Sequence, residues 1–249
     1  MLRYDACPMP DKDKFTLDQV TGRARDHVSE LSDPACTLHK DVIAPFLAMR
    51  AAAAADGIDL VAFSSFRDFD RQLAIWNGKF RGDRPLQDRA GRSIDVLALS
   101  AAERVAAILW WSALPGASRH HWGTDIDVMD ANARPAGYRL QVVPAEYAPD
   151  GPFARLTTWL DAHMHAFGFF RPYASDRGGV SPEPWHLSYA PVAVRALATL
   201  TPERLREVLA TSGIEGKEAV LAALPGNFAR YVADIDPPSE EALLSPRLS

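Results

Sequence analysis

Two adjacent histidines and two aspartates lie within the short stretch SRHHWGTDIDV, residues 118–128. Imidazole nitrogens and carboxylate oxygens are ligands of zinc, and a catalytic zinc takes three protein ligands and keeps a fourth position for water. If the second half of this stretch is a strand, Asp125 and Asp127 share one face, because alternate side chains of a strand do so. Asp127 and a histidine of the preceding turn, His120, could then supply two ligands. A third ligand must come from elsewhere in the chain.

A candidate for the third ligand is His186 in SPEPWHLSY, residues 181–189. The prolines at positions 182 and 184 exclude a regular helix, so we expect this segment to enter as an extended strand. Glu183 precedes His186 by three residues, and a carboxylate beside a metal site can act as a general base towards water. The strand would place apolar side chains on the face opposite His186: Trp185, Leu187 and Tyr189.

Four segments of the chain, in the correct order, resemble the VanY-type D,D-carboxypeptidases, which belong to a group of peptidoglycan metallopeptidases with lysostaphin-like enzymes and the hedgehog domain. SRHHWGTDID resembles the Ser-x-His-x-x-Gly-x-x-x-Asp motif of that family, and EPWHLSY resembles its Glu-x-x-His segment. SSFRDFDRQ, residues 64–72, is similar to the Ser-Gly-Tyr-Arg-Ser…Gln segment. WLDAHMHAFGFFRPY, residues 159–173, is similar to the Trp-Leu…His-x-x-Gly-Phe…Tyr helix. A single His-x6-Asp pattern would have little specificity, whereas four ordered segments are specific.

Carried over by position, the resemblance implies that His120, Asp127 and His186 are zinc ligands and that Glu183 is the catalytic base. Arg67 matches the arginine that steadies the substrate and the oxyanion, although it could also be a surface arginine that follows a strand. Four more residues are assigned to substrate binding, two by matching the terminal-carboxylate pocket and two as neighbours of the ligands: Gln72, Ser118, Trp185 and Tyr189. Trp122 also flanks the ligands and is expected in the cleft wall.

The chain departs from the family pattern at two positions. Ser65 stands where glycine is usual, and Asp125 stands where the family usually carries a small residue. Because Asp125 is expected on the face of Asp127, it could hydrogen-bond a ligand histidine from behind the metal or alter specificity. His121 should point away from the metal, at the surface or behind a ligand. His163 and His165, two positions apart on a predicted helix, cannot bind one ion together.

The resemblance implies a zinc peptidase that removes a terminal D-alanine from a peptidoglycan stem peptide or muropeptide. Two alternatives remain: an endolysin-like endopeptidase that cuts L-Ala-D-Glu bonds, and a hedgehog-like binding module that holds zinc without turnover. Glu183 together with Arg67 argues against a pure binding module, which has no need of either. The C-terminal residues lack the basic or aromatic repeats typical of a wall-binding endolysin tail.

The elements that must position these residues indicate an α+β fold, with a central, mostly antiparallel sheet that carries the zinc site, flanking helices and a C-terminal helical appendage. We expect an N-terminal segment (residues 1–40), a zinc carboxypeptidase domain (41–190) and a C-terminal helical extension (191–249). The capping pattern of Ser100 and Glu103 predicts a helix start, and Thr201 is expected to cap another. Hydrophobic periodicity predicts helices over 39–58, 68–78, 100–114 and 153–168, and strands over 59–66, 124–130 and 185–189.

Composition limits the possible classes of partner. The 249 residues are 47% hydrophobic and carry a formal net charge of -5, so a core is possible and the basic excess of a nucleic-acid-binding protein is absent. No stretch approaches the ~20 apolar residues of a membrane span, and the first residues lack the apolar run of a signal peptide. We therefore expect a cytoplasmic protein unless another route exports it.

Cys7 and Cys36 are expected to be separate thiols. The end of the chain, from residue 236, is expected to be frayed.

Overall fold

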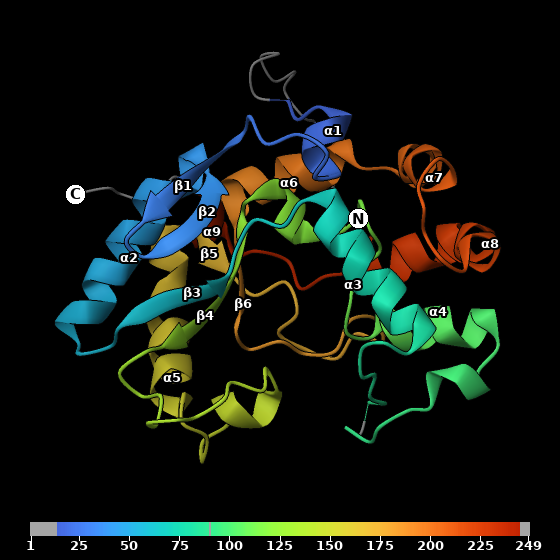
Figure 1. The fold of residues 1–249 in the computed structure, drawn as a ribbon. Coiled ribbons are helices and arrows are strands. Elements are labelled where there is room, and N and C mark those ends of the chain that lie inside the picture. The colour runs from blue at the N-terminus through green and yellow to red at the C-terminus, as the bar shows by residue number, and fades with distance from the viewer. Residues whose placement is uncertain (1–13, 90, 245–249) are drawn as a thin grey trace.

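The computed structural model describes residues 14–89 and 91–244, which form an α+β fold (Figure 1). The strands are β1 (Val28–Ser32), β2 (Ala35–His39), β3 (Leu60–Ser64), β4 (Asp125–Asp130), β5 (Phe169–Phe170) and β6 (His186–Tyr189). The α-helices are α1 (Leu17–Val20), α2 (Ile43–Ala55), α3 (Phe69–Arg81), α4 (Ala101–Leu109), α5 (Ala154–His163), α6 (Ala190–Thr199), α7 (Pro202–Ala210), α8 (Lys217–Phe228) and α9 (Glu240–Leu243). The predicted fold class is confirmed.

The central sheet has the strand order β3-β4-β6-β5, and every neighbouring pair is antiparallel. Its register sets Asp127 of β4 directly opposite His186 of β6, and Asp125 opposite Ser188. Side chains at opposed positions of an antiparallel pair lie on the same face of the sheet, about 5 Å apart. The pairing of β4 with β6 therefore brings together residues that are far apart in the sequence.

A second sheet, the hairpin of β1 and β2, lies above β3 in the view of Figure 1, and β2 contacts β3. The sequence analysis did not predict this hairpin. Along β1 only Val28 is buried, and the following residues are exposed or half-buried. A short strand with so few apolar side chains has a weak strand signal, so only the tertiary contacts specify it.

Helix α3 is longer than predicted. Its end was expected at Asn77 and Gly78, but the helix continues to Arg81 and stops at Gly82, which has a left-handed backbone (φ 84°). Gly78 is buried inside the helix, where a Cβ atom would lie 3.1 Å from the side chain of Arg84. The glycine thus serves close packing rather than helix termination, and the extra turn carries Lys79.

Helix α4 starts where predicted but ends at Leu109, five residues before the predicted end at residue 114. The side chain of Ser100 caps α4, while Glu103 Oε2 accepts a hydrogen bond from the Ser100 backbone N at 2.9 Å. Helix α5 ends at His163 and is followed by a 3-10 turn that closes at Gly168. The predicted capping of α7 by Thr201 is confirmed.

The C-terminal helices share the hydrophobic core of the central domain: α8 contacts α4, and α7 contacts α8, on the right of the view in Figure 1. The contiguous core cluster contains residues from Phe15 to Val232, and Trp76 of α3 donates its indole N–H to the carbonyl of Glu215 at 3.2 Å. The expected boundaries near residues 40 and 190 remain a prediction.

The prediction of a frayed end is wrong for the described part of that segment. Residues Glu240–Leu243 form α9, and the side chain of Ala242 is buried.

Residues 245–249 lie outside the described part of the chain, as does Cys7, whereas Cys36 is a buried free thiol. Among the described helices, none has the length and apolarity needed to cross a bilayer.

Candidate metal centre and its cavity

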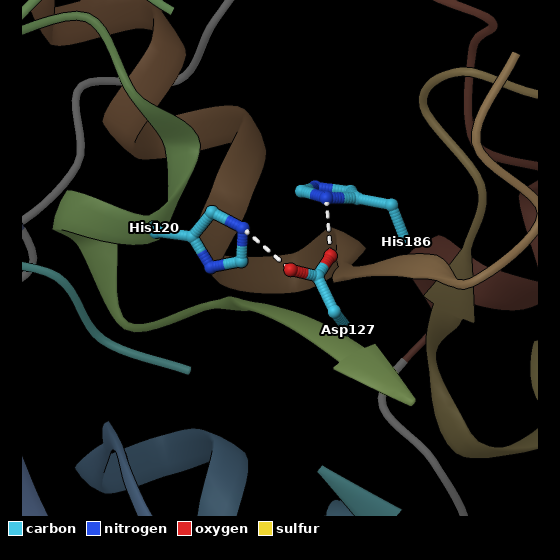
Figure 2. Close-up of side chains that lie close together, drawn as sticks. All are labelled: His120, Asp127 and His186. Carbon is cyan, nitrogen blue, oxygen red and sulfur yellow. Dashed lines mark hydrogen bonds and ion pairs between the residues drawn. The ribbon is translucent and has the colours of Figure 1, made fainter. Parts of the chain in front are cut away.

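Three side chains from two neighbouring strands and one turn converge on a single point (Figure 2). His120 lies in the 3-10 turn Arg119–Trp122 that precedes β4, Asp127 lies on β4, and His186 opens β6. One potential ligand atom from each residue lies within 4.8 Å of the others, and all three side chains are buried. Asp127 is central: its two oxygens lie 3.4 Å from His120 Nε2 and 3.0 Å from His186 Nδ1.

The hydrogen bond of His120 Nδ1 determines which ring nitrogen of this histidine is free to bind a metal. Nδ1 lies 3.0 Å from the backbone carbonyl of Ser65. Because a carbonyl oxygen only accepts hydrogen bonds, Nδ1 carries the proton and donates it. Nε2 is thereby left with its lone pair directed towards Asp127, which is the tautomer that a metal ligand requires.

His186 is oriented in the same way by Asp125. Its Nε2 lies 2.9 Å from Asp125 Oδ1, and its Nδ1 faces Asp127 at 3.0 Å. The expectation that Asp125 shares a face with Asp127 and contacts a ligand histidine agrees with this geometry. A carboxylate that accepts the outer N–H of a ligand histidine fixes the ring orientation and increases the basicity of the inner nitrogen.

Asp125 is fully buried, and its charge is balanced by Arg119, whose Nε donates to Oδ1 at 2.7 Å. The hydroxyls of Thr124 and Ser188 donate to Oδ2 at 2.5 and 3.1 Å. The guanidinium of Arg119 also lies 4.6 Å from the ring centroid of Trp122. The sequence analysis missed Arg119. Asp125 replaces the small residue that is usual in the family, and a buried aspartate needs a buried cation nearby.

The electrostatics of the cluster suit a divalent cation. Burial lowers the pKa of His186, but the contacts with Asp125 and Asp127 outweigh burial and raise it to about 10. Burial acts to raise the pKa of Asp127, yet the two histidines hold it well below its usual range. The two carboxylates therefore stay ionised and stabilise positive charge at this point, whether a protonated imidazole or a metal ion carries it. The N,O,N donor set therefore fits zinc, held by His120 Nε2, the Asp127 carboxylate and His186 Nδ1.

Glu183 lies beside this cluster, in the turn that leads into β6. Its Oε2 is 3.5 Å from His186 Nδ1, and its backbone N donates to the carbonyl of Tyr173 at 2.9 Å. Burial raises the pKa of Glu183 to about 7, against the opposing effect of the nearby His186. A carboxyl group with that pKa can both accept and release a proton near neutral pH.

Arg67 is anchored by its backbone to the turn that carries His120. Its N–H donates to the His120 carbonyl at 3.1 Å, and its own carbonyl accepts from His121 Nδ1 at 2.6 Å. The guanidinium donates through Nη1 to Gln72 Oε1 at 2.8 Å and through Nη2 to Ser64 Oγ at 3.1 Å. Arg67 is therefore held rigidly, which excludes the reading of a free surface arginine.

These residues line a cavity of about 620 Å³. Its wall includes the three candidate ligands, Glu183 and Arg67, and also Ser118 and Trp185 as predicted. Gln72 is placed elsewhere, because its Oε1 accepts from Arg67 and its Nε2 donates to the Ala113 carbonyl at 2.8 Å, so both ends of the amide are engaged by the protein.

Two further aromatic residues lie away from the cavity. Tyr189 packs its ring 5.4 Å from that of Phe169, on the core side of β6. Trp122 is fully buried and donates its indole N–H to the Val20 carbonyl at 3.1 Å. The expectations that Trp122 forms the cleft wall and that Tyr189 binds substrate are corrected, because each side chain packs into the core and neither lines the cavity.

The cavity also contains residues that the sequence analysis did not select: Lys79, Arg84, Tyr173, and the segment 141–143. Tyr173 closes the segment that resembles the family helix, and its ring lies 5.2 Å from that of His186. That segment was a usable signal for Tyr173. Lys79 had no such signal, because Gly78 was read as the end of its helix.

The remaining histidines of the predicted segments contact residues other than the three candidate ligands. His121 is fully buried, with Nε2 accepting from the Gly116 backbone N at 3.0 Å, so it lies in the core rather than at the surface. Burial lowers its pKa to about 3. His163 is exposed and stacks on Trp159, whereas His165 is half-buried and contacts Ser239.

Comparison with known proteins gives one family. The profile of the VanY family, described as D-alanyl-D-alanine carboxypeptidase, matches residues 35–192. An uncharacterized protein of Haemophilus influenzae is 35% identical over 121 residues, which are 48% of this chain and 92% of that protein. A D-alanyl-D-alanine carboxypeptidase of Enterococcus faecalis is 27% identical over 141 residues, which are 55% of this chain and 42% of that protein.

Solved structures with a similar arrangement of elements have low sequence identity. VanYB in complex with D-alanine-D-alanine is 22% identical, with a TM-score of 0.49 and coverage of 74% of this chain and 88% of that chain. A VanY D,D-pentapeptidase mutant in complex with Zn(II) is also 22% identical, with a TM-score of 0.49 and coverage of 80% and 92%. The LD-carboxypeptidase LdcB is 20% identical, with a TM-score of 0.45 and coverage of 74% and 68%.

Proposed function

The chain belongs to the VanY family of D-alanyl-D-alanine carboxypeptidases, and from this premise we propose that it is a zinc-dependent carboxypeptidase that removes a terminal D-alanine from peptidoglycan stem peptides or muropeptides. The observation that carries the proposal is the position of Glu183, whose carboxylate lies 3.5 Å from Nδ1 of the candidate ligand His186. A general base is needed at that place only if a bond is to be hydrolysed there.

The metal would be held by the three buried residues His120, Asp127 and His186. When bound, zinc supplies Lewis acidity, which polarises a carbonyl and lowers the pKa of water from 15.7 towards ~7. Asp125 and Ser65 contribute by holding the outer nitrogens of the two histidines, so that the inner nitrogens are the ones aimed at the metal.

Glu183 performs the proton transfers in this proposal. Its carboxylate accepts a proton from the attacking water and then donates that proton to the nitrogen of the leaving amino acid. Burial holds its pKa at about 7, so neither transfer is strongly uphill at neutral pH. The short segment that links Glu183 to His186 fixes the base at a constant distance from the metal ligands.

Arg67 orients the substrate. Gln72 and Ser64 each occupy one terminal nitrogen of its guanidinium, which leaves other N–H groups of the five available to a substrate oxygen. A fixed donor of this kind, aimed at an oxygen that gains negative charge, contributes about 3 kcal/mol to the transition state. Because the fork is held before substrate binds, it needs no rearrangement during the reaction.

The experiment is an incubation of the zinc-loaded protein with a muropeptide whose stem ends in D-Ala-D-Ala, followed by mass analysis of the products. We expect loss of a single terminal alanine, and we expect Glu183→Gln to retain zinc and to lose most of this turnover. Cleavage at an internal L-Ala-D-Glu bond would replace the proposal with an endopeptidase. Absence of any cleavage by zinc-loaded wild type would favour the binding module.

A further inference from the structure

We propose that Lys79 anchors the C-terminal carboxylate of the substrate, in a cationic subsite that it forms with Arg84 in the wall of the cavity that contains the metal ligands. The inference deepens the proposed function and rests on it. It assigns the selection of a free C-terminus to a residue outside the segments that resemble the family motifs. Gln72, the residue expected in this role, is engaged by Arg67 and Ala113.

Lys79 offers hydrogen-bond donors to the cavity. Its ammonium group donates to Ser112 Oγ at 2.6 Å, and both residues line the cavity. An ammonium group has three N–H donors, so this contact leaves two for a ligand. In residues 14–89 and 91–244 Lys79 forms no ion pair with a carboxylate. A half-buried cation that forms no such ion pair is a suitable partner for an anionic ligand.

The charged groups of the cavity act on one another. The charge of Asp127 acts on Arg67, and that of Glu183 acts on both Arg67 and Lys79. Lys79, Arg84 and Glu183 line the same cavity as the metal ligands.

The cavity offers a group for each part of a C-terminal dipeptide. The scissile carbonyl must lie at the metal ligands and Arg67, and the leaving nitrogen must lie at Glu183, which protonates it. In the leaving amino acid the carboxylate is separated from that nitrogen by one carbon atom. The carboxylate therefore lies in the same cavity, whose wall also carries the cations Lys79 and Arg84.

The charge balance supports the same assignment. Asp125 is neutralised by Arg119, and Asp127 is committed to the two histidines and the metal they would hold. Arg67, Lys79 and Arg84 then face Glu183 alone in the cavity wall. The side chain of Arg84 packs against Gly78, the residue before Lys79, because Gly78 has no side chain in the space that Arg84 fills. Such a net positive pocket favours a substrate with a free terminal carboxylate.

The test uses a matched pair of stem peptides, one with a free C-terminal carboxylate and one with an amide. A hydrogen bond to a charged group contributes about 1.5–3 kcal/mol, so Lys79→Gln should raise KM for the free acid by roughly 10- to 100-fold. KM for the amide and zinc content should change little, so the preference for the acid should be lost. Arg71→Gln is the matched control, because it removes an exposed cation from the same helix.

A binding measurement separates this inference from the catalytic proposal. In the zinc-loaded Glu183→Gln protein, calorimetry with the free-acid peptide should show a Kd that Lys79→Gln weakens by the same factor. Equal binding with and without Lys79, or an unchanged acid-to-amide ratio in Lys79→Gln, would overturn the subsite. If wild type bound the acid peptide through Lys79 but hydrolysed neither peptide, the catalytic proposal would fail and the subsite would stand.

Discussion

The Nε2 atom of His186 lies 2.9 Å from Oδ1 of Asp125, and this contact turns the opposite nitrogen of the ring towards Asp127. The aspartate is itself held by Arg119, so a chain of buried charges connects the protein interior to the metal site. A ligand that is held at its outer nitrogen needs less reorganisation when the metal binds.

Replacement of Asp125 by asparagine should therefore weaken zinc binding without abolishing it. The amide removes the negative charge that supports His186, and such changes typically cost about 10- to 100-fold in affinity. Titration against a competing chelator measures the effect, and saturating zinc should still restore about one ion per chain. Asp130→Asn is the control, because Asp130 is buried on the same strand and accepts from the backbone of Asp59 and Asn132 instead. Unchanged zinc affinity in Asp125→Asn would show that the contact is not needed.

The ligands themselves should be indispensable for the metal. We expect about one zinc per chain in gently purified protein, removed by a strong chelator and absent from His120→Ala, Asp127→Ala and His186→Ala. Elemental analysis of each purified variant gives the stoichiometry. His163→Ala is the matched control, since His163 is exposed on α5 and stacks on Trp159. Stoichiometric zinc in any of the three ligand variants would remove that residue from the donor set.

The sequence was informative about the metal site because the site depends on short-range geometry. Alternation along residues 124–130 placed Asp125 and Asp127 on one face, and both contact His186 in the structure. The pairing of Asp127 with His186 across β4 and β6 is long-range. Only the family resemblance, not local periodicity, could predict it.

The pocket was less predictable, because its lining depends on which side chains other residues have already engaged. Gln72 matched a family position, yet Arg67 occupies its carbonyl oxygen. Tyr189 and Trp122 flank ligands in the sequence but face the core in space. Lys79 could not be selected, because one glycine has the same local signature whether it ends a helix or gives space to a packed arginine.

The preference for a free C-terminus should depend on pH. Burial lowers the pKa of Lys79 to about 8, although the charge of Glu183 acts in the opposite direction. Below that pH the ammonium is charged and binds the carboxylate, and as the pH rises through about 8 the charge is lost. The acid-to-amide ratio of kcat/KM should therefore fall between about pH 7 and about pH 9.

Lys79→Arg provides the comparison for this pH profile. An arginine keeps its charge to far higher pH, so the profile of the ratio should become flat. The cations that also act on Lys79 are Arg84 and Arg67. A wild-type ratio that stayed constant across the interval would disconnect the preference from Lys79.

The C-terminal segment should control the order of the loop that leads to Glu183. Asp236 accepts hydrogen bonds from the backbone N and the hydroxyl of Ser175 at 2.9 and 2.8 Å, and its own N–H donates to the Pro172 carbonyl at 3.0 Å. Tyr173, between these contacts, holds the backbone of Glu183. Since small displacements of a catalytic group are costly, Asp236→Ala should lower kcat by roughly 3- to 10-fold with zinc content unchanged.

Hydrogen exchange in residues 171–180 is the direct measurement of this effect, and it should become faster in Asp236→Ala. Glu240→Ala serves as the control, because Glu240 is an exposed residue of the same C-terminal segment. If exchange and kcat both stayed at wild-type values, the contacts of Asp236 would not hold the loop.

Arg67→Lys should be poorly tolerated even though it keeps the positive charge. The guanidinium donates to Gln72 Oε1 and Ser64 Oγ through different nitrogens, and a single ammonium group cannot reproduce that planar geometry. Gln72 is fully buried, so its carbonyl oxygen would lose a partner and the donor aimed at the substrate would lose its fixed direction. We expect kcat/KM to fall by about 100-fold, the order of effect seen when one oriented donor is removed. Zinc content should stay at one per chain, and Arg71→Lys on the exposed face of α3 should keep wild-type rates. A fully active Arg67→Lys enzyme would mean that charge alone is sufficient at this position and that the rigid fork has no part in orienting the substrate.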